Sequence, residues 1–285
     1  MVPQSLRMKR LLVAIALAAC GKDAAPTTLS HPLLWKAEKD GVATYLLGTM
    51  HVGVDAKRLP KIVWDKLAAA KAFAMETDPT APELAHLGDR VDRTTLHQEL
   101  GDAYWAKLEA RVGAPTAAQL DSQKALVAAI VLEMQGLPQT TAMEDVLVGE
   151  ARREHKPVVY LEPAAAQVAV LDRWMDARMV KGMLDHPIHD GDLRDAYVAG
   201  DEREMLATAA AERGVAKAAG YSDAEYDQEL ADLLYGRNAA WITPIERLHA
   251  SGGGFIAVGA LHLLGDKSVL DLLSHRGFTV SRVEP

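Results

Sequence analysis

The chain has 285 residues, of which 49% are hydrophobic and 25% are charged. This balance is typical of a globular fold with a sizeable core and excludes a disordered, collagen-like or coiled-coil chain. The net charge is −8 and no basic stripe is present, which argues against binding to nucleic acid and against electrostatic adhesion to anionic lipid.

The first residues have the pattern of an export signal. Three basic residues precede an apolar run over residues 11–19, which is too short to span a bilayer as a permanent helix. The only cysteine, Cys20, follows in a sequence that resembles a bacterial lipobox. We interpret residues 1–19 as a lipoprotein signal peptide and Cys20 as a lipidation site that attaches the protein to a membrane. The alternative is an ordinary cleaved signal with an incidental cysteine.

The folded domain is expected to begin after a short tether. Residues 20–31 are mostly small and polar, whereas strand-like segments over 33–36 and 42–47 flank an Asp-Gly pair. This pattern predicts a hairpin that opens a single domain over residues 32–285.

A helix and a buried strand follow the hairpin. Residues 61–71 have apolar positions at helical spacing, and residues 72–75 form a short apolar run that ends at Glu76-Thr77-Asp78. This order of elements predicts a strand–helix–strand unit with carboxylates at a strand end.

The middle of the chain is predicted to be helical. Residues 94–154 and 164–245 have helical patterns, and a buried strand over 158–161 separates them and ends at Glu162. We expect the second stretch to be interrupted near His186-Pro187, Gly191, Gly220 and Gly236.

The last part returns to strands, over 255–258 and 278–283, around a helix over 267–275. The expected fold is therefore α/β, with one mixed central sheet built from strands at both ends of the chain and a large helical insertion.

A short pattern, Gly-x-x-His, occurs at Gly48–His51 and again at Gly259–His262. Each copy closes a strand-like run, so each histidine is expected at the carboxyl end of a strand. Ligands bind at this edge of open α/β sheets, and the two histidines are expected to meet there.

Imidazole and carboxylate groups at strand ends are suited to a divalent metal. His51, His262 and Glu76 are the candidate ligands, and a metal there would support hydrolysis. Asp78 and Glu162 also follow strands, and either is a candidate to orient a ligand, to complete the metal sphere or to act as general base. The chain has no His-Glu-x-x-His motif, no Cys-x-x-Cys pair and no Gly-x-Ser-x-Gly elbow.

Arg237, with Trp241 one helical turn further on, has two interpretations. It is a candidate clamp for a substrate carboxylate or an oxyanion, or it forms an ion pair that ties its helix to the sheet. His186, His189 and Asp190 resemble an exposed loop more than a metal site, and Ser251–Gly254 resembles a flexible connection more than a phosphate loop.

These residues together resemble the TraB/PrgY/GumN family, which includes the animal Tiki proteins. The resemblance is carried by Gly48-Thr49-Met50-His51, Met75-Glu76-Thr77-Asp78, Leu161-Glu162 with Gln167, Arg237-Asn238 and Gly259-Ala260-Leu261-His262, over about residues 33–285. It implies an α/β fold with a helical insertion and a metal-dependent hydrolase site, with manganese or cobalt as the metal and zinc as a further candidate. The chain departs from the family pattern at Glu162-Pro163, where Glu-Thr is expected.

Our first hypothesis is an exported, lipid-anchored, metal-dependent hydrolase of the bacterial cell envelope that acts on a peptide or protein. In it, Glu76, Glu162 and Arg237 take part in the chemistry and Asp78 supports a ligand. The second hypothesis is a non-catalytic envelope lipoprotein that captures a peptide or glycan in the same cleft. The oligomeric state does not follow from the sequence.

Overall fold

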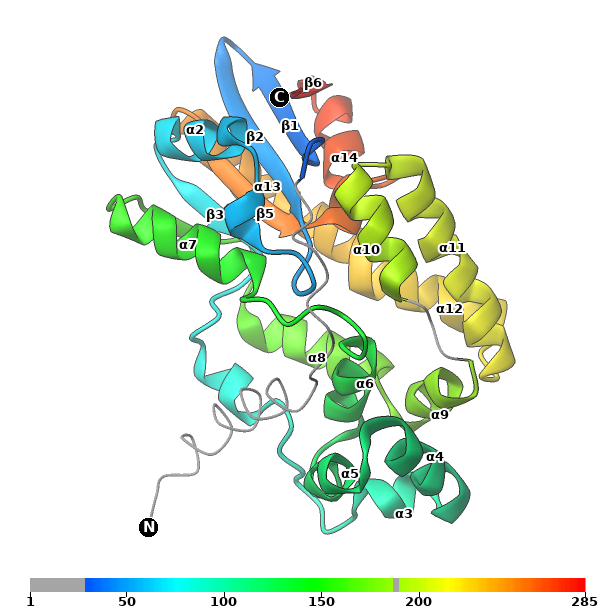
Figure 1. Ribbon diagram of the computed structural model, residues 1–285. Helices are drawn as coiled ribbons and strands as arrows, with labels where there is room; N and C mark the ends of the chain where they lie inside the picture. The colour runs from blue at the N-terminus through cyan, green and yellow to red at the C-terminus, as the bar shows by residue number, and fades with distance from the viewer. Residues whose placement is uncertain (1–28, 187–189, 285) are drawn as a thin grey trace.

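The computed structural model describes residues 29–186 and 190–284. The predicted signal peptide, Cys20, most of the tether and His189 lie outside the described residues. Figure 1 shows a twisted sheet at one end of the molecule, with most of the helical insertion beside and beyond it.

The described strands form one six-stranded sheet in the order β4-β3-β5-β2-β1-β6. Their bounds are Leu34–Lys39 for β1, Val42–Thr49 for β2, Phe73–Met75 for β3, Val158–Tyr160 for β4, Phe255–Gly259 for β5 and Thr279–Arg282 for β6. β2, β3, β4 and β5 pair in parallel, whereas β1 is antiparallel to both of its neighbours. The predicted mixed sheet, with strands from both ends of the chain, is therefore confirmed.

The opening hairpin is confirmed, with strands longer than predicted. Lys39 pairs with Val42 across the turn, and both central residues have positive φ, 51° at Asp40 and 75° at Gly41. Two positive φ values are the signature of the type I′ turn, whose twist matches that of the strands it joins.

The strand–helix–strand unit does not place its two strands side by side. α2 (Lys61–Ala69) connects β2 to β3, but β5 lies between them and pairs with both. Crossovers between parallel strands are right-handed. The chain moves one way across the sheet from β2 to β3 and β4, and the other way from β4 to β5 and β6. The helices of these two sets of connections therefore lie on opposite faces of the sheet. α2 and α7 (Met143–Arg153) cover one face, and α13 (Gly236–Ala250) and α14 (Val269–His275) cover the other (Figure 1).

The insertion is helical, as predicted. Its remaining α-helices are α3 (Leu96–Leu100), α4 (Asp102–Val112), α5 (Ala114–Leu120), α6 (Ala125–Glu133), α8 (Ala164–Trp174), α9 (Ala177–Asp185), α10 (Asp190–Ala199), α11 (Glu202–Ala218) and α12 (Asp223–Leu230). α3 to α6 and α9 share a hydrophobic cluster of their own, beside the main core around the sheet. None of the helices within the described residues is long and apolar enough to cross a bilayer.

Two of the predicted interruptions are wrong. Gly191 lies within α10, and Gly236 begins α13 directly after a π-helical segment, Ala231–Tyr235, which itself continues α12. A glycine inside a helix costs only about 1 kcal/mol, which the packing of a long helix offsets. Gly220, with a φ of 88°, does stand between two helices.

Candidate active site

Four of the predicted site residues follow strands whose carboxyl ends lie at one edge of the sheet. Register fixes this arrangement, because Thr49 of β2 pairs with Gly259 of β5 and Met75 of β3 pairs with Ala257. His51, Glu76, Glu162 and His262 come within three residues after β2, β3, β4 and β5. The structure thus brings together groups that are up to 211 positions apart in the chain.

Gly259 lies at the centre of this group. Its amide donates a hydrogen bond of 2.8 Å to Oε1 of Glu76, and Nε2 of His262 lies 3.9 Å from the same oxygen. A Cβ atom at position 259 would meet Glu76 Oε1 at 3.4 Å, His262 Cδ2 at 3.5 Å and His51 Nε2 at 3.9 Å. The three candidate ligands therefore surround the space that a side chain at this position would fill.

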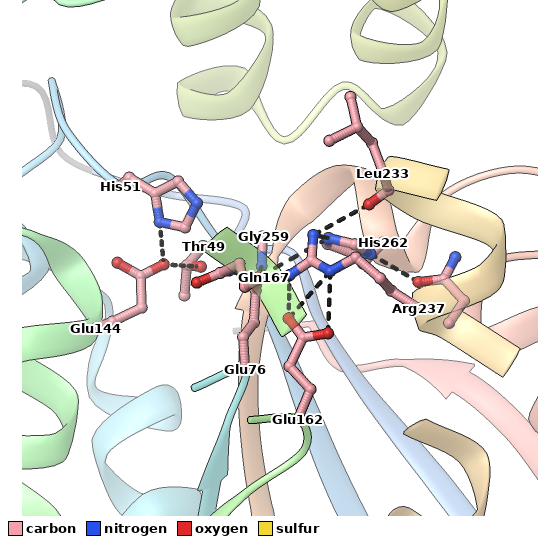
Figure 2. Close-up of polar contacts among 11 residues, drawn as sticks. Thr49, His51, Glu76, Glu144, Glu162, Gln167, Leu233, Arg237, Gly259 and His262 are labelled. Carbon is pink, nitrogen blue, oxygen red and sulfur yellow. Dashed lines mark hydrogen bonds and ion pairs between the residues drawn. The ribbon is translucent and has the colours of Figure 1, made fainter. Parts of the chain in front are cut away.

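Arg237 of α13 joins the carboxylates of two strand ends (Figure 2). Its Nη2 donates to Glu76 Oε2 and to Glu162 Oε1, both at 2.6 Å, and its Nε donates to Glu162 at 3.0 Å. Its Nη1 donates to the carbonyl oxygen of Leu233 at 3.0 Å and contacts His262 Nε2 at 3.2 Å. All five N–H groups of the guanidinium are thus engaged. The ion pair between helix and sheet is present, despite Pro163 after Glu162.

The backbone around Arg237 is specialised. Leu233, which accepts one of its hydrogen bonds, lies in the π-helical segment before α13, and such segments occur frequently at functional sites. Trp241 is fully buried one turn after Arg237, where its ring lies 4.9 Å from the guanidinium and 4.5 Å from the ring of His262. The same indole thus packs against both side chains.

The protonation state of His262 follows from its contacts. Asn238 donates from Nδ2 to the Lys267 carbonyl at 3.0 Å, so its Oδ1 accepts from Nδ1 of His262 at 2.6 Å. Nε2 is then the nitrogen with a free electron pair, directed toward Arg237 and Glu76. Burial, reinforced by the charge of Arg237, lowers the pKa of His262 to about 4. His262 is therefore neutral at pH 7.

His51 is held in a different way. Its Nδ1 lies 2.9 Å from Oε1 of Glu144, and the same oxygen accepts a hydrogen bond from the hydroxyl of Thr49. The charge of Glu144 raises the pKa of His51 to about 10. The His51 side chain is 66% exposed, whereas the side chains of Glu76 and His262 are almost wholly buried. The group is thus open to solvent on the His51 side.

Glu76 is ionised despite its burial. Burial alone would raise its pKa, but the charges of His262, which is protonated below its pKa of about 4, and of His51 and Arg237, together with the Gly259 amide, lower the pKa of Glu76 to about 2. Gln167 of α8 donates a further hydrogen bond of 3.1 Å to its Oε2. Glu76 is therefore ionised at pH 7, with the charges of Arg237 and His51 beside it.

Glu144 was not predicted from the sequence, although the pattern of α7 contains a signal for it. Met143, Glu144, Leu147, Val148 and Ala151 are the buried residues of α7, so Glu144 occupies a position where the helical period calls for an apolar side chain. The partner of such a carboxylate lies 93 residues away and cannot be identified from the pattern.

Asp78 and His186 stand apart from the group. Asp78 accepts hydrogen bonds from the backbone and the hydroxyl of Thr80, at 2.9 and 2.7 Å, in an exposed turn. Among the described residues, no hydrogen bond or ion pair joins Asp78 to either site histidine. His186 is exposed at the end of α9.

The donors fit a divalent cation in chemical type. Each histidine has its Nδ1 bound by an oxygen atom, which is usual for metal-binding histidines. A metal would take the place of the hydrogen bond from Arg237 at Nε2 of His262 and of the proton at Nε2 of His51. Two imidazoles and one carboxylate also match the ligand sets of catalytic zinc sites. In the part of the chain that the structure describes, however, no three His, Cys, Asp or Glu side chains already have the spacing of a metal site. Arg237 provides the positive charge beside Glu76.

A comparison with protein-family models matches residues 33–282 to the TraB/PrgY/gumN family. No curated protein and no protein of solved structure matches the chain significantly.

Proposed function

Because the chain belongs to the TraB/PrgY/gumN family, we propose that it is a metal-dependent hydrolase that cleaves a peptide or protein. The observation that supports a metal is the position of His51, His262 and Glu76 around the space over Gly259. The choice of a peptide substrate follows the resemblance to the Tiki proteins.

His51 and His262 would hold the metal through Nε2, and Glu76 through its carboxylate. A divalent ion in such a site acidifies a bound water and polarises the substrate carbonyl. The substrate would approach from the side of His51, which is the exposed member of the group.

Glu162 and Arg237 would support the chemistry around the metal. Glu162 lies at the neighbouring strand end and is the candidate general base, with Arg237 holding its carboxylate in place. Because every N–H group of Arg237 is engaged, the guanidinium can bind a substrate oxygen only by exchanging one of its present partners. The two bonds of Nη1, to the Leu233 carbonyl and to His262 Nε2, are those whose exchange leaves both carboxylates paired.

We place the protein in the bacterial cell envelope, attached to a membrane by lipid on Cys20. The support is the basic and apolar pattern of residues 1–19 and the lipobox-like sequence before the cysteine.

The test is a calorimetric titration of the full chain, purified in mild detergent, with manganese, cobalt and zinc. His51→Ala and His262→Ala are each expected to abolish binding. His275→Ala is the matched control, because this histidine lies exposed on α14, and it is expected to bind as the wild type does. A folded pair of site variants that both retain wild-type affinity would refute the assignment.

A peptide library incubated with the metal-loaded wild type and analysed by mass spectrometry then tests the substrate class. If the wild type binds no metal, the remaining hypothesis is capture of a peptide or glycan at the same strand ends without chemistry.

A further inference from the structure

Glu144 has contacts that a purely structural residue of α7 would not need. It is a carboxylate on the buried face of its helix, and burial of an unpaired charge there would be costly. Its polar contacts are instead with His51 and with the hydroxyl of Thr49. The polar partners of the carboxylate thus lie at the end of the strand that precedes His51.

The two oxygens of Glu144 have different surroundings. Oε1 is shared by Nδ1 of His51 and the hydroxyl of Thr49, whereas Oε2 is buried without a hydrogen-bond partner among the described residues. A structural ion pair would be expected to use both oxygens, as Glu162 does with Arg237. The contacts of Glu144 are directed at one ring nitrogen of one histidine.

His51 needs such a contact because little else restrains its ring. It lies two residues beyond β2 in a bend, and two thirds of its side chain is exposed. A free imidazole in this position would rotate and would offer either nitrogen to a ligand. With Nδ1 bound to Glu144, only Nε2 faces Gly259 and Glu76.

His262 has the equivalent contact with a neutral partner. The Asn238 amide oxygen binds its Nδ1, and the ring is also packed against Trp241. His262 is thus fixed by packing and by an amide, whereas His51 is fixed by a carboxylate alone. A carboxylate partner makes the opposite nitrogen a stronger metal ligand.

We propose that Glu144, itself held by Thr49, is a positioning residue that presents Nε2 of His51 to the active site. As far as it concerns a metal, this proposal rests on the proposed function. It extends that function because part of the metal affinity would then depend on a residue of α7 that lies outside the strand-end motifs.

The experiment uses the full chain in mild detergent and three variants. Glu144→Gln keeps the acceptor and removes the charge. Glu144→Leu combined with Thr49→Val removes the carboxylate and also the hydroxyl that is bound to it, so that no buried hydroxyl is left unpaired. Asp145→Asn is the matched control, since Asp145 is the exposed neighbour of Glu144 on α7.

Two measurements are made on each protein. Calorimetry with manganese gives the metal affinity, and thermal unfolding without metal shows whether the fold is intact. We expect the double variant to lose about 10- to 100-fold in affinity, Glu144→Gln to lose less, and Asp145→Asn to be unchanged. Wild-type affinity in a folded double variant would overturn the proposal and leave the proposed function standing.

A metal-independent measurement separates this proposal from the proposed function. In protein labelled with ¹⁵N-histidine, the Nδ1 proton of His51 is expected to give an exchange-protected downfield NMR signal that disappears in the double variant. Should the wild type bind no metal, the proposed function fails, and this signal alone decides whether Glu144 positions His51. Persistence of the signal in the double variant would overturn the proposal.

Discussion

Replacement of Arg237 by alanine tests the charge balance of the site most directly. The side chains of Glu76 and Glu162 are only 8% and 10% exposed, and Arg237 is the cation that contacts both. Removal of one partner from a buried ion pair costs about 3–5 kcal/mol, because the remaining charge stays buried without compensation. In a fold of this size, that loss corresponds to a fall of roughly 6–20 °C in Tm.

The matched control is Arg213→Ala. Arg213 also contacts two carboxylates, those of Asp223 and Asp227, but all three side chains are well exposed. Ion pairs of this kind contribute about 0–1 kcal/mol. Urea unfolding at pH 7, followed by tryptophan fluorescence, compares both variants with the wild type. Equal and small losses in the two variants would refute the charge balance described for the site.

The loss of stability in Arg237→Ala should also depend on pH. The folded pKa of Glu76, about 2, lies below its ordinary value of 4.5, so the ionised carboxylate stabilises the fold above pH 4.5, and this stability is lost as the pH falls toward 2. Without Arg237 the pKa of Glu76 should rise, and protonation would then remove the uncompensated charge. The difference between wild type and Arg237→Ala is therefore expected to be larger at pH 7 than at pH 4.

Three further changes give distinct results. Gly259→Ala keeps a backbone that alanine accepts, with φ of −50° and ψ of 135°, but its methyl group would enter the space between the candidate ligands. We expect manganese affinity to fall about tenfold or more with little change in Tm. The control Gly149→Ala, whose Cβ would meet nothing within 4 Å, should leave the affinity unchanged. Unaltered affinity in Gly259→Ala would contradict the proposed position of the metal site. Burial, and then the charge of Asp176, raises the pKa of Glu229 from 4.5 to about 7, so its folded form loses stability as the pH rises from about 4.5 to 7. Glu229→Gln is expected to stabilise the protein by about 2 kcal/mol at pH 8.5 and by much less at pH 4, and urea unfolding with an equal effect at both pH values would disprove this. Cys20→Ala should abolish incorporation of labelled palmitate in cells and release the protein from the membrane fraction, whereas an unlabelled wild type would rule out lipidation.

The sheet edge could be predicted because each site residue follows its own strand pattern. The apolar runs before His51, Glu76, Glu162 and His262 identify strands, and parallel strands end at one edge. The position of β5 between β2 and β3 could not be predicted, since period and composition do not specify which strands pair. The glycines at 191 and 236 were misjudged for a related reason, because tertiary packing overrides a weak local preference.

The side-chain contacts behind the strand ends were harder to foresee. Arg237 was identified, and one of its two interpretations, the ion pair, is present in the structure. The contacts of Glu144 and Asn238 with the two histidines were not predicted, because each joins a helix to a strand end that is distant in the sequence, and the helical pattern does not identify such a partner.

The position of β5 between β3 and β2 affects the order in which the protein can assemble during synthesis. β5 is the fifth strand in the chain, yet it lies in the interior of the sheet and contributes His262 just beyond its end. The ribosome synthesises β2, β3, β4 and the whole helical insertion before the strand that joins them exists. Pairings over such sequence separations form slowly, so the candidate catalytic centre should be among the last parts of the molecule to assemble. A nascent or prematurely terminated chain that stops before residue 255 would carry His51 and both strand-end glutamates without an organised centre.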